Sequence, residues 1–281
     1  MSRRKLFRHI FLGLAVLMVL VWSLFPLYWL FVSTISSDQE LRHRPPHVFP
    51  NHPTLENYAT ILFGDNSTVR GFRFSLGNSL VVSLIATAII LILASSAAYV
   101  LTRYRFRGRG VLFGGLIYLN MLPLVAVIIP FYIIADALGL IDTKLALIVF
   151  YSGMNLTLAI WLLRNYFLTL PPELEEAAVL DGCSPIQVVF KVVLPLARPG
   201  LSAVGILTFL AIWNEFFLAL IMTFSEKSQT FPVMLLTFSG RYAYNFAMTN
   251  TGALLGLVPP LGIMIIFNHW IISGLTAGYE R

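Results

Sequence analysis

The chain has 281 residues, of which 58% are hydrophobic and only 11% are charged. Soluble domains carry about 25% charged residues, so this composition excludes an ordinary soluble protein and indicates a membrane protein that crosses the bilayer several times. The net charge of +6 does not indicate a nucleic-acid partner, because the basic residues border apolar segments instead of forming a stripe on a soluble fold.

Six apolar stretches predict an all-α membrane protein with six transmembrane helices. A stretch of about 20 apolar residues is long enough to cross a bilayer. The first stretch lacks the short apolar core and the cleavage site of a signal peptide, so we expect it to be retained. Pro123 and Pro130 are expected to break the third stretch in its middle. The predicted spans, all within one transmembrane domain of residues 1–281, are 10–33, 76–101, 111–136, 145–163, 201–221 and 253–272.

The distribution of lysine and arginine predicts which side of the membrane each loop occupies. With six spans and an inner N-terminus, twelve of the 19 basic residues lie on the inner side and seven on the outer side. Basic residues are enriched in cytoplasmic loops. We therefore expect both termini, and the polar segment 171–200 between the fourth and fifth spans, to be cytoplasmic.

Segment 171–200 predicts a compact pair of short helices joined by a glycine turn. Pro172 suits the first turn of a helix, and the three glutamates that follow it favour the positive end of the helix dipole. Asp181-Gly182 provides the stop, with Gly182 in the left-handed conformation. Ala177 and Ala178 have almost no side chain, so we expect that another surface can approach this helix closely.

A second short helix is expected to begin at Ser184-Pro185, with the serine as N-cap and the proline as the first helical residue. Its apolar residues recur at i, i+3, i+4 and i+7, which predicts a single apolar face. That face would consist of Ile186, Val189, Phe190 and Val193.

The same segment resembles the EAA loop of permease subunits of ATP-binding-cassette (ABC) importers. The pattern of that loop is Glu-Ala-Ala, three residues, Gly, nine residues and then Ile-x-Leu-Pro. This chain matches every spacing with Glu176-Ala177-Ala178, Gly182 and Val192-Val193-Leu194-Pro195, where valine replaces isoleucine. Other stretches, including Trp213-Asn214-Glu215, resemble the six-helix permeases of maltose-type sugar importers. The alternative interpretation is a cytoplasmic helical hairpin without a partner.

The resemblance implies a function and a set of partners. The first helix of an EAA loop docks in a cleft of a cytoplasmic ATPase and carries its motion to the membrane. The implied partners are a second homologous permease, a homodimeric ABC ATPase, an extracytoplasmic substrate-binding protein and membrane lipid, in a prokaryotic plasma (inner) membrane. ATP and Mg would bind the ATPase, and no cofactor is expected on this chain. The residues expected to couple to the ATPase are Glu175, Glu176, Ala177, Ala178, Asp181, Gly182, Leu194 and Pro195.

Polar residues within predicted spans are candidates for a substrate pathway, because such residues are rare in a membrane and costly to bury. Glu215 is the most costly, and it lies roughly 21 Å along a helix that begins at Leu201. Trp213 and Asn214 beside it combine a stacking face with an amide, which is the chemistry of a sugar site. Interhelical hydrogen bonds are the alternative role for these groups. The candidates are Asn120, Asn155, Trp213, Asn214 and Glu215.

No catalytic set emerges from the sequence, and no metal site is expected. The chain has no glycine-rich phosphate-binding loop of the G-x-x-x-x-G-K-[ST] kind, so we expect a transport subunit without its own ATPase site. The single cysteine, Cys183, excludes an internal disulfide. The main hypothesis is thus a sugar importer permease. The alternatives are a permease for another solute, such as a glycerol phosphate derivative or an oligopeptide, and a passive channel or structural membrane subunit.

Overall fold

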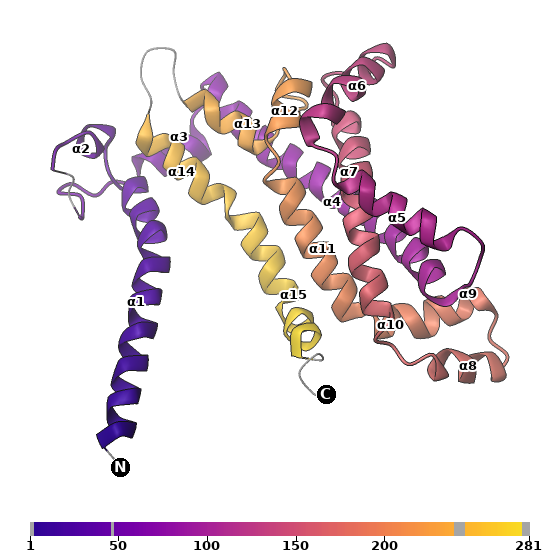
Figure 1. Ribbon diagram of the computed structural model, residues 1–281. Helices are drawn as coiled ribbons and strands as arrows, with labels where there is room; N and C mark the ends of the chain where they lie inside the picture. The colour runs from indigo at the N-terminus through magenta and orange to yellow at the C-terminus, as the bar shows by residue number, and fades with distance from the viewer. Residues whose placement is uncertain (1–2, 46–47, 239–244, 277–281) are drawn as a thin grey trace. The chain divides into compact units, whose positions relative to one another are not determined.

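The computed structural model describes residues 3–45, 48–238 and 245–276, and for residues 3–8 and 268–276 it describes the backbone alone. Within these ranges every regular element is a helix, as Figure 1 shows. The chain divides into two compact units, one of residues 1–73 and 234–258 and the other of residues 74–233 and 259–281. The expectation of a single domain is not tested by this division and stays a prediction.

The first unit is built around α1 (Arg3–Thr34) and α14 (Phe246–Gly256), which lie against each other, with the short helices α2 (Asp38–Leu41) and α3 (Glu56–Phe63) beside them. The end of α1 is fixed to α3 by side chains. Thr34 Oγ1 and Tyr58 Oη are 2.6 Å apart, and Asn57 Nδ2 donates to the carbonyls of Thr34 and Ser36. These bonds satisfy carbonyl groups that a helix end leaves without partners.

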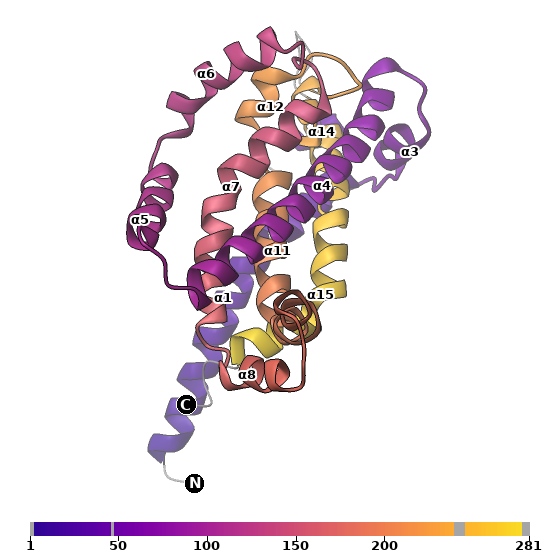
Figure 2. The same ribbon diagram turned by 90° about the vertical axis from the view of Figure 1, so that its right-hand side faces the viewer.

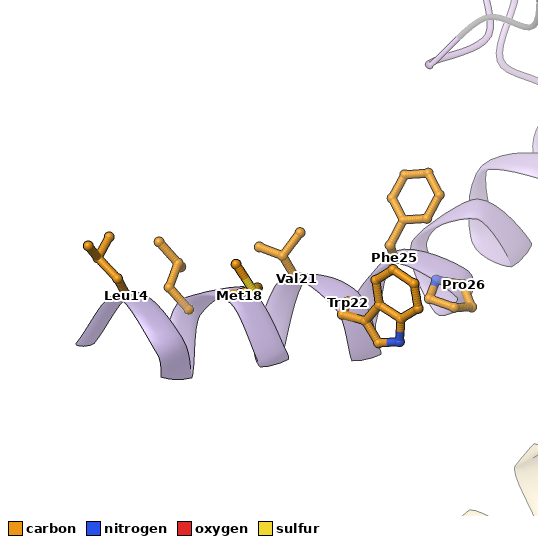
Figure 3. Close-up of a pocket in the computed structure, with 7 residues that line it drawn as sticks. Leu14, Met18, Val21, Trp22, Phe25 and Pro26 are labelled. Carbon is orange, nitrogen blue, oxygen red and sulfur yellow. The ribbon is translucent and has the colours of Figure 1, made fainter. Parts of the chain in front are cut away.

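The middle of α1 is exposed apolar surface. Leu14, Met18, Val21, Trp22 and Phe25 line a shallow hollow that belongs to this one helix, and their side chains are drawn in Figure 3. Trp22 is 83% exposed. A soluble protein rarely exposes so large an apolar surface, whereas a bilayer or a neighbouring membrane helix covers it at no cost.

The second unit contains the long helices α4 (Ser67–Arg103, of which residues from Phe74 belong here), α7 (Lys144–Phe167), α11 (Arg198–Trp213) and α15 (Val258–Thr276). Helices α7 and α11 run side by side in both views (Figures 1 and 2). The buried face of α4 repeats every four residues, and its small side chains allow close helix packing. The residues of this face are Val82, Ala86, Ile90, Ala94 and Ala98.

Two of the predicted spans are broken. Residues 111–136 form α5 (Arg109–Asn120) and α6 (Leu124–Ala137), whose axes differ by 94°, and Figure 2 shows the bend between them. The break lies at Pro123, as expected, because proline removes a helical hydrogen bond. Pro130 was expected to break the span too, but it lies inside α6. The fifth span ends early: α11 stops at Trp213, and the six-residue helix α12 (Phe217–Met222) follows.

Some of the described helices are long and apolar enough to cross a membrane. Four helices qualify, at His9–Thr34, Ser67–Arg103, Lys144–Phe167 and Phe246–Phe267. Two bent pairs qualify if each counts as one span: Arg109–Asn120 with Leu124–Ala137, and Pro185–Leu196 with Arg198–Trp213. The fold is therefore all-helical with four to six candidate spans.

The contact between α7 and α11 depends on Gly200. A Cβ atom at this position would lie 2.5 Å from Cγ of the Tyr166 ring and 2.6 Å from its Cδ1. Gly200→Ala is therefore expected to push α7 and α11 apart and to destabilise the protein by about 1–3 kcal/mol. Thermal unfolding in detergent measures the effect. Gly153→Ala on α7 is the matched control, because a Cβ there meets nothing within 4 Å. Equal stability of the two variants would contradict this view of the interface.

Candidate functional site

The segment 171–200 forms the two short helices that the sequence predicts. Helix α8 (Glu173–Leu180) follows Pro172, and α9 (Pro185–Val188) follows a glycine turn. Gly182 has φ +84°. Its N–H donates to the carbonyl of Val179, and the N–H of Cys183 donates to that of Ala178. This pair of bonds is the Schellman arrangement that ends a helix, and it needs a left-handed residue.

Helix α9 begins with a capping box. The side chain of Ser184 accepts from the N–H of Gln187, and the side chain of Gln187 accepts from the N–H of Ser184. The two bonds satisfy two N–H groups at the start of the helix. The turn between α8 and α9 is thus defined at both ends by local chemistry, as the sequence predicts.

The predicted apolar face of the second helix is wrong. Residues Val189–Val193 form a π-helical turn between α9 and α10 (Leu194–Leu196), and the buried side chains are Val188 and Val193, five residues apart. Ile186 and Phe190 are 71% and 66% exposed. The wider turn precedes Pro195, which has no N–H to donate and crowds the carbonyl four residues before it. Leu194 and Pro195 themselves are half-buried.

Helix α8 has one face toward its own chain and one toward solvent. Ala178 is 8% exposed and lies in the apolar core together with Val188 and Val193. The outer face consists of Glu173, Leu174, Glu176, Ala177, Val179 and Leu180, with Asp181 and Gly182 beyond it. Leu180 is 88% exposed. Both alanines were expected to let a partner protein approach α8 closely. Only Ala177 is accessible to a partner, because Ala178 is buried against other residues of this chain.

Glu175 is the glutamate of α8 that points inward. Its Oε1 accepts a hydrogen bond of 2.7 Å from Arg103 Nε, and its Oε2 accepts one of 3.0 Å from the hydroxyl of Tyr99. Both donors lie in the last turns of α4, and neither was predicted to take part in this site. Their spacing of four residues, which places them on one helix face, is the signal that could have found them.

The polar triplet after α11 lies at the helix break rather than inside a continuous helix. Trp213 is 2% exposed and is stacked between Phe209 and Phe231, at ring-centroid distances of 5.7 and 5.8 Å. Asn214 is exposed, and its Nδ2 donates to the carbonyl of Leu210. The stacking face expected of Trp213 is therefore occupied by neighbouring rings.

Glu215 joins two helices. Its Oε2 accepts a hydrogen bond of 2.5 Å from the hydroxyl of Tyr151 on α7, and its two oxygens accept from the N–H groups of Leu218 and Ala219 at the start of α12. A carboxylate suits that position, because the first N–H groups of a helix have no partners within it. The sequence predicts that Glu215 lies roughly 21 Å from Leu201 along one continuous helix. That prediction is wrong, because α11 ends two residues before Glu215.

The remaining two candidates lie elsewhere. Asn155 is half-buried on α7 and its Nδ2 donates to the carbonyl of Tyr151, while Asn120 is the exposed last residue of α5. The structure brings Glu215 to Tyr151, one turn from Asn155. Contact of any of these five residues with a substrate stays a prediction.

A loop opposite the α8 end of α4 is held by residues that were not predicted to act as a group. Asn78 Nδ2 donates to the carbonyls of Glu226 and Gln229, and Ser79 Oγ accepts from the N–H of Phe231. Asp142 Oδ1 accepts from the N–H groups of Phe224 and Ser225 and from the Ser228 hydroxyl. We define residues 223–231 as the clamped loop.

The charge of Asp142 is favoured by these bonds. Burial alone would raise the pKa of the Asp142 carboxyl, but the hydrogen bonds from Ser228, Phe224 and Ser225 outweigh it and lower the pKa to about 2. Because the pKa is lowered on folding, the stabilisation is complete at neutral pH and is lost only as the pH falls toward 2. The Asp142 carboxylate is thus expected to keep these bonds across the physiological pH range.

Together, the long apolar helices and the exposed α8–α9 segment define a helical membrane protein with several candidate spans. The comparison with known families makes this specific: residues 90–273 match the binding-protein-dependent transport system inner membrane component family, and the chain belongs to it. It is accordingly a multi-pass protein of the inner membrane, and an ABC transporter permease.

Curated relatives are similar over almost the whole chain. The sulfoquinovosyl glycerol transport system permease protein SmoH of Agrobacterium fabrum is 34% identical, over 94% of this chain and 91% of its own length. The trehalose transport system permease protein SugB of Mycobacterium tuberculosis is 34% identical, over 93% of each. The diacetylchitobiose uptake system permease protein DasC of Streptomyces coelicolor is 30% identical, over 98% of each.

A solved structure supports the fold. The chain is similar to one from a bacterial ABC transporter involved in the import of the acidic polysaccharide alginate, with a TM-score of 0.81 and 22% identity, over 96% of this chain and 99% of that one. The similarity therefore extends over nearly the full length of both chains.

Proposed function

We propose that this chain is one of the two transmembrane subunits of an ABC importer for a sugar or a sugar derivative. Three curated relatives that are at least 30% identical are named for the transport of sulfoquinovosyl glycerol, diacetylchitobiose and trehalose. The chain would cross the membrane six times with both termini in the cytoplasm. It would pair with a second homologous permease, two copies of an ATPase and an extracytoplasmic binding protein.

The observation that carries the proposal is the geometry of α8. This helix is held on its inner side by Glu175 and Ala178, and it presents Glu176, Ala177 and the 88% exposed Leu180 outward. An apolar residue that is so exposed in a polar segment, beside a small residue and a carboxylate, suits insertion into a cleft of a partner. The ATPase would hold the ATP and Mg, so this chain needs no cofactor of its own.

Reconstitution tests this function. The chain, purified in mild detergent from its native membrane, is expected to bring with it a second permease and an ATPase. In proteoliposomes supplied with the binding protein, trehalose, diacetylchitobiose or sulfoquinovosyl glycerol is expected to stimulate ATP hydrolysis and to enter the vesicles. Uptake of oligopeptides or glycerol phosphate derivatives instead would favour another solute. Purification without an ATPase, or solute flux that does not require ATP, would favour a passive channel or a structural subunit.

Cysteine labelling tests the orientation. The native chain has one cysteine, Cys183, in the turn between α8 and α9. An impermeant maleimide is expected to label Cys183 only after the cells are made permeable. Ser67→Cys and Lys227→Cys, at solvent-accessible positions on the proposed outer side, are expected to react in intact cells. Labelling of Cys183 in intact cells would refute both the topology and the docking of α8 to a cytoplasmic ATPase.

A further inference from the structure

Glu175 connects α8 to the end of α4 through a compact set of hydrogen bonds. The Arg103 guanidinium donates through Nε to Glu175 Oε1 at 2.7 Å and through Nη2 to the carbonyl of Leu170 at 3.0 Å. Tyr99, one turn earlier on α4, donates to Glu175 Oε2 at 3.0 Å. One arginine therefore holds both α8 and the linker that precedes it, and both oxygens of the carboxylate have donors on α4.

This connection is partly shielded from water. The side chains of Arg103 and Glu175 are 17% and 14% exposed. An ion pair at this depth is screened less than a surface pair, and removal of one partner leaves the other charge buried without compensation. Arginine suits the position because its planar fork bonds two acceptors in fixed directions, which a lysine cannot do. Its place in the last turn of α4 also favours a positive charge.

The other glutamates of α8 do not take part. Glu173 and Glu176 are exposed on the outer face, where a partner can reach them, whereas Glu175 faces the chain. Helix α8 packs its backbone against α9 and the π-helical turn. The hydrogen bonds between α8 and α4 run through the side chains of Glu175, Tyr99 and Arg103.

Helix α4 makes a second set of contacts near the start of its part in this unit. Asn78 and Ser79 hold the clamped loop through the carbonyls of Glu226 and Gln229 and the N–H of Phe231. A continuous helix joins these residues to Arg103, and its rise of 1.5 Å per residue separates Asn78 from Arg103 by roughly 37 Å. A displacement of one end of a continuous, packed helix is transmitted to the other end, because packed helices shift as rigid elements.

We propose that Glu175 is a positioning residue that transmits the displacement of α8 to α4, and through α4 to the clamped loop on the far side of the unit. The inference rests on the function proposed above, in which α8 moves with an ATPase. Glu175 does not dock the ATPase in this scheme; the outer face of α8 does. Its role is to make α4 follow α8.

The test compares transport with ATP hydrolysis in proteoliposomes of the whole importer. In Glu175→Gln and Arg103→Lys the outer face of α8 is unchanged, so the ATPase is expected to co-purify as with the native chain. The amount of sugar imported per ATP hydrolysed is expected to fall about tenfold, the scale of a typical coupling free energy. Tyr99→Phe removes one hydrogen bond and keeps the ion pair, so we expect a smaller loss. Arg107→Lys, an exposed position four residues beyond Arg103, is the matched control and should import normally.

A charge exchange between Glu175 and Arg103 distinguishes a role in transmitting motion from a role in stabilising the fold. Glu175→Arg and Arg103→Glu should each uncouple transport, and the double exchange should recover a large part of the import per ATP. If instead the variants lose thermal stability and ATPase together while the remaining complexes import a normal amount per ATP, Glu175 is only structural and the proposal is overturned. Failure of the proposed function itself looks different, since the native chain would then co-purify with no ATPase at all.

Discussion

Replacement of Gly182 by valine is expected to abolish uptake. Gly182 has φ +84°, a region in which a β-branched residue is strained, and its N–H and that of Cys183 close the end of α8. A Cβ there meets nothing within 4 Å, so the expected damage comes from the backbone conformation alone. Relief of the strain would turn α9 away from its position and carry α8 with it.

A graded series separates conformation from size. Asparagine enters the left-handed region readily and alanine does so at a cost of about 1–2 kcal/mol. Uptake into reconstituted vesicles is therefore expected to decrease in the order glycine, asparagine, alanine, valine, with expression in the membrane unchanged. Full uptake by Gly182→Val would mean that this segment does not couple ATP hydrolysis to transport.

The two alanines of α8 are expected to fail in different ways when each is replaced by tryptophan. Ala178 is 8% exposed and lies in the core, so Ala178→Trp should force α8 off its own chain and lower thermal stability, with an overpacking cost of about 1–3 kcal/mol or more. Ala177 is exposed, so Ala177→Trp should leave the isolated permease as stable as the native chain and prevent the ATPase from docking. Both variants should abolish uptake.

Thermal unfolding in detergent and co-purification of the ATPase distinguish the two failures. Loss of ATPase with full stability is the expected signature of Ala177→Trp alone. If Ala177→Trp retained the ATPase and normal uptake, the outer face of α8 would not be the docking surface. If Ala178→Trp unfolded no more easily than the native chain, Ala178 would not be buried in solution.

Local signals explain what could be predicted for the α8–α9 segment. Helix starts and stops depend on residues within a few positions, so Pro172, Gly182 and Ser184 could be assigned from the sequence. The structure has α8, the left-handed glycine and the N-cap serine where these residues predict them. The face of the second helix could not be predicted, because the i, i+3, i+4 pattern assumes an α-helix. The π-helical turn before Pro195 changes which residues share a face.

For polar residues in apolar stretches, the local sequence identifies the unusual residue but not the residue that it contacts. Glu215 was recognised as unusual because a charge in a membrane is costly, but nothing near it in the sequence names Tyr151, which lies on another helix and donates to it. The same holds for Trp213, whose ring is covered by Phe209 and Phe231. The clamped loop depends on Asn78, Ser79 and Asp142, which come from distant parts of the chain.

Composition and local patterns are enough to predict an all-helical membrane protein with a polar helix–turn–helix segment between apolar stretches. The membrane class follows from composition and from apolar runs long enough to span a bilayer. The helix ends follow from prolines and glycines, which act on the backbone within a few residues. The packing of the folded chain was needed to show that Glu175 faces Arg103 while Glu176 faces outward, and that α11 ends before Glu215. The physical reason is that such choices depend on which other helix lies alongside, and a neighbour from a distant part of the chain leaves no trace in the local pattern.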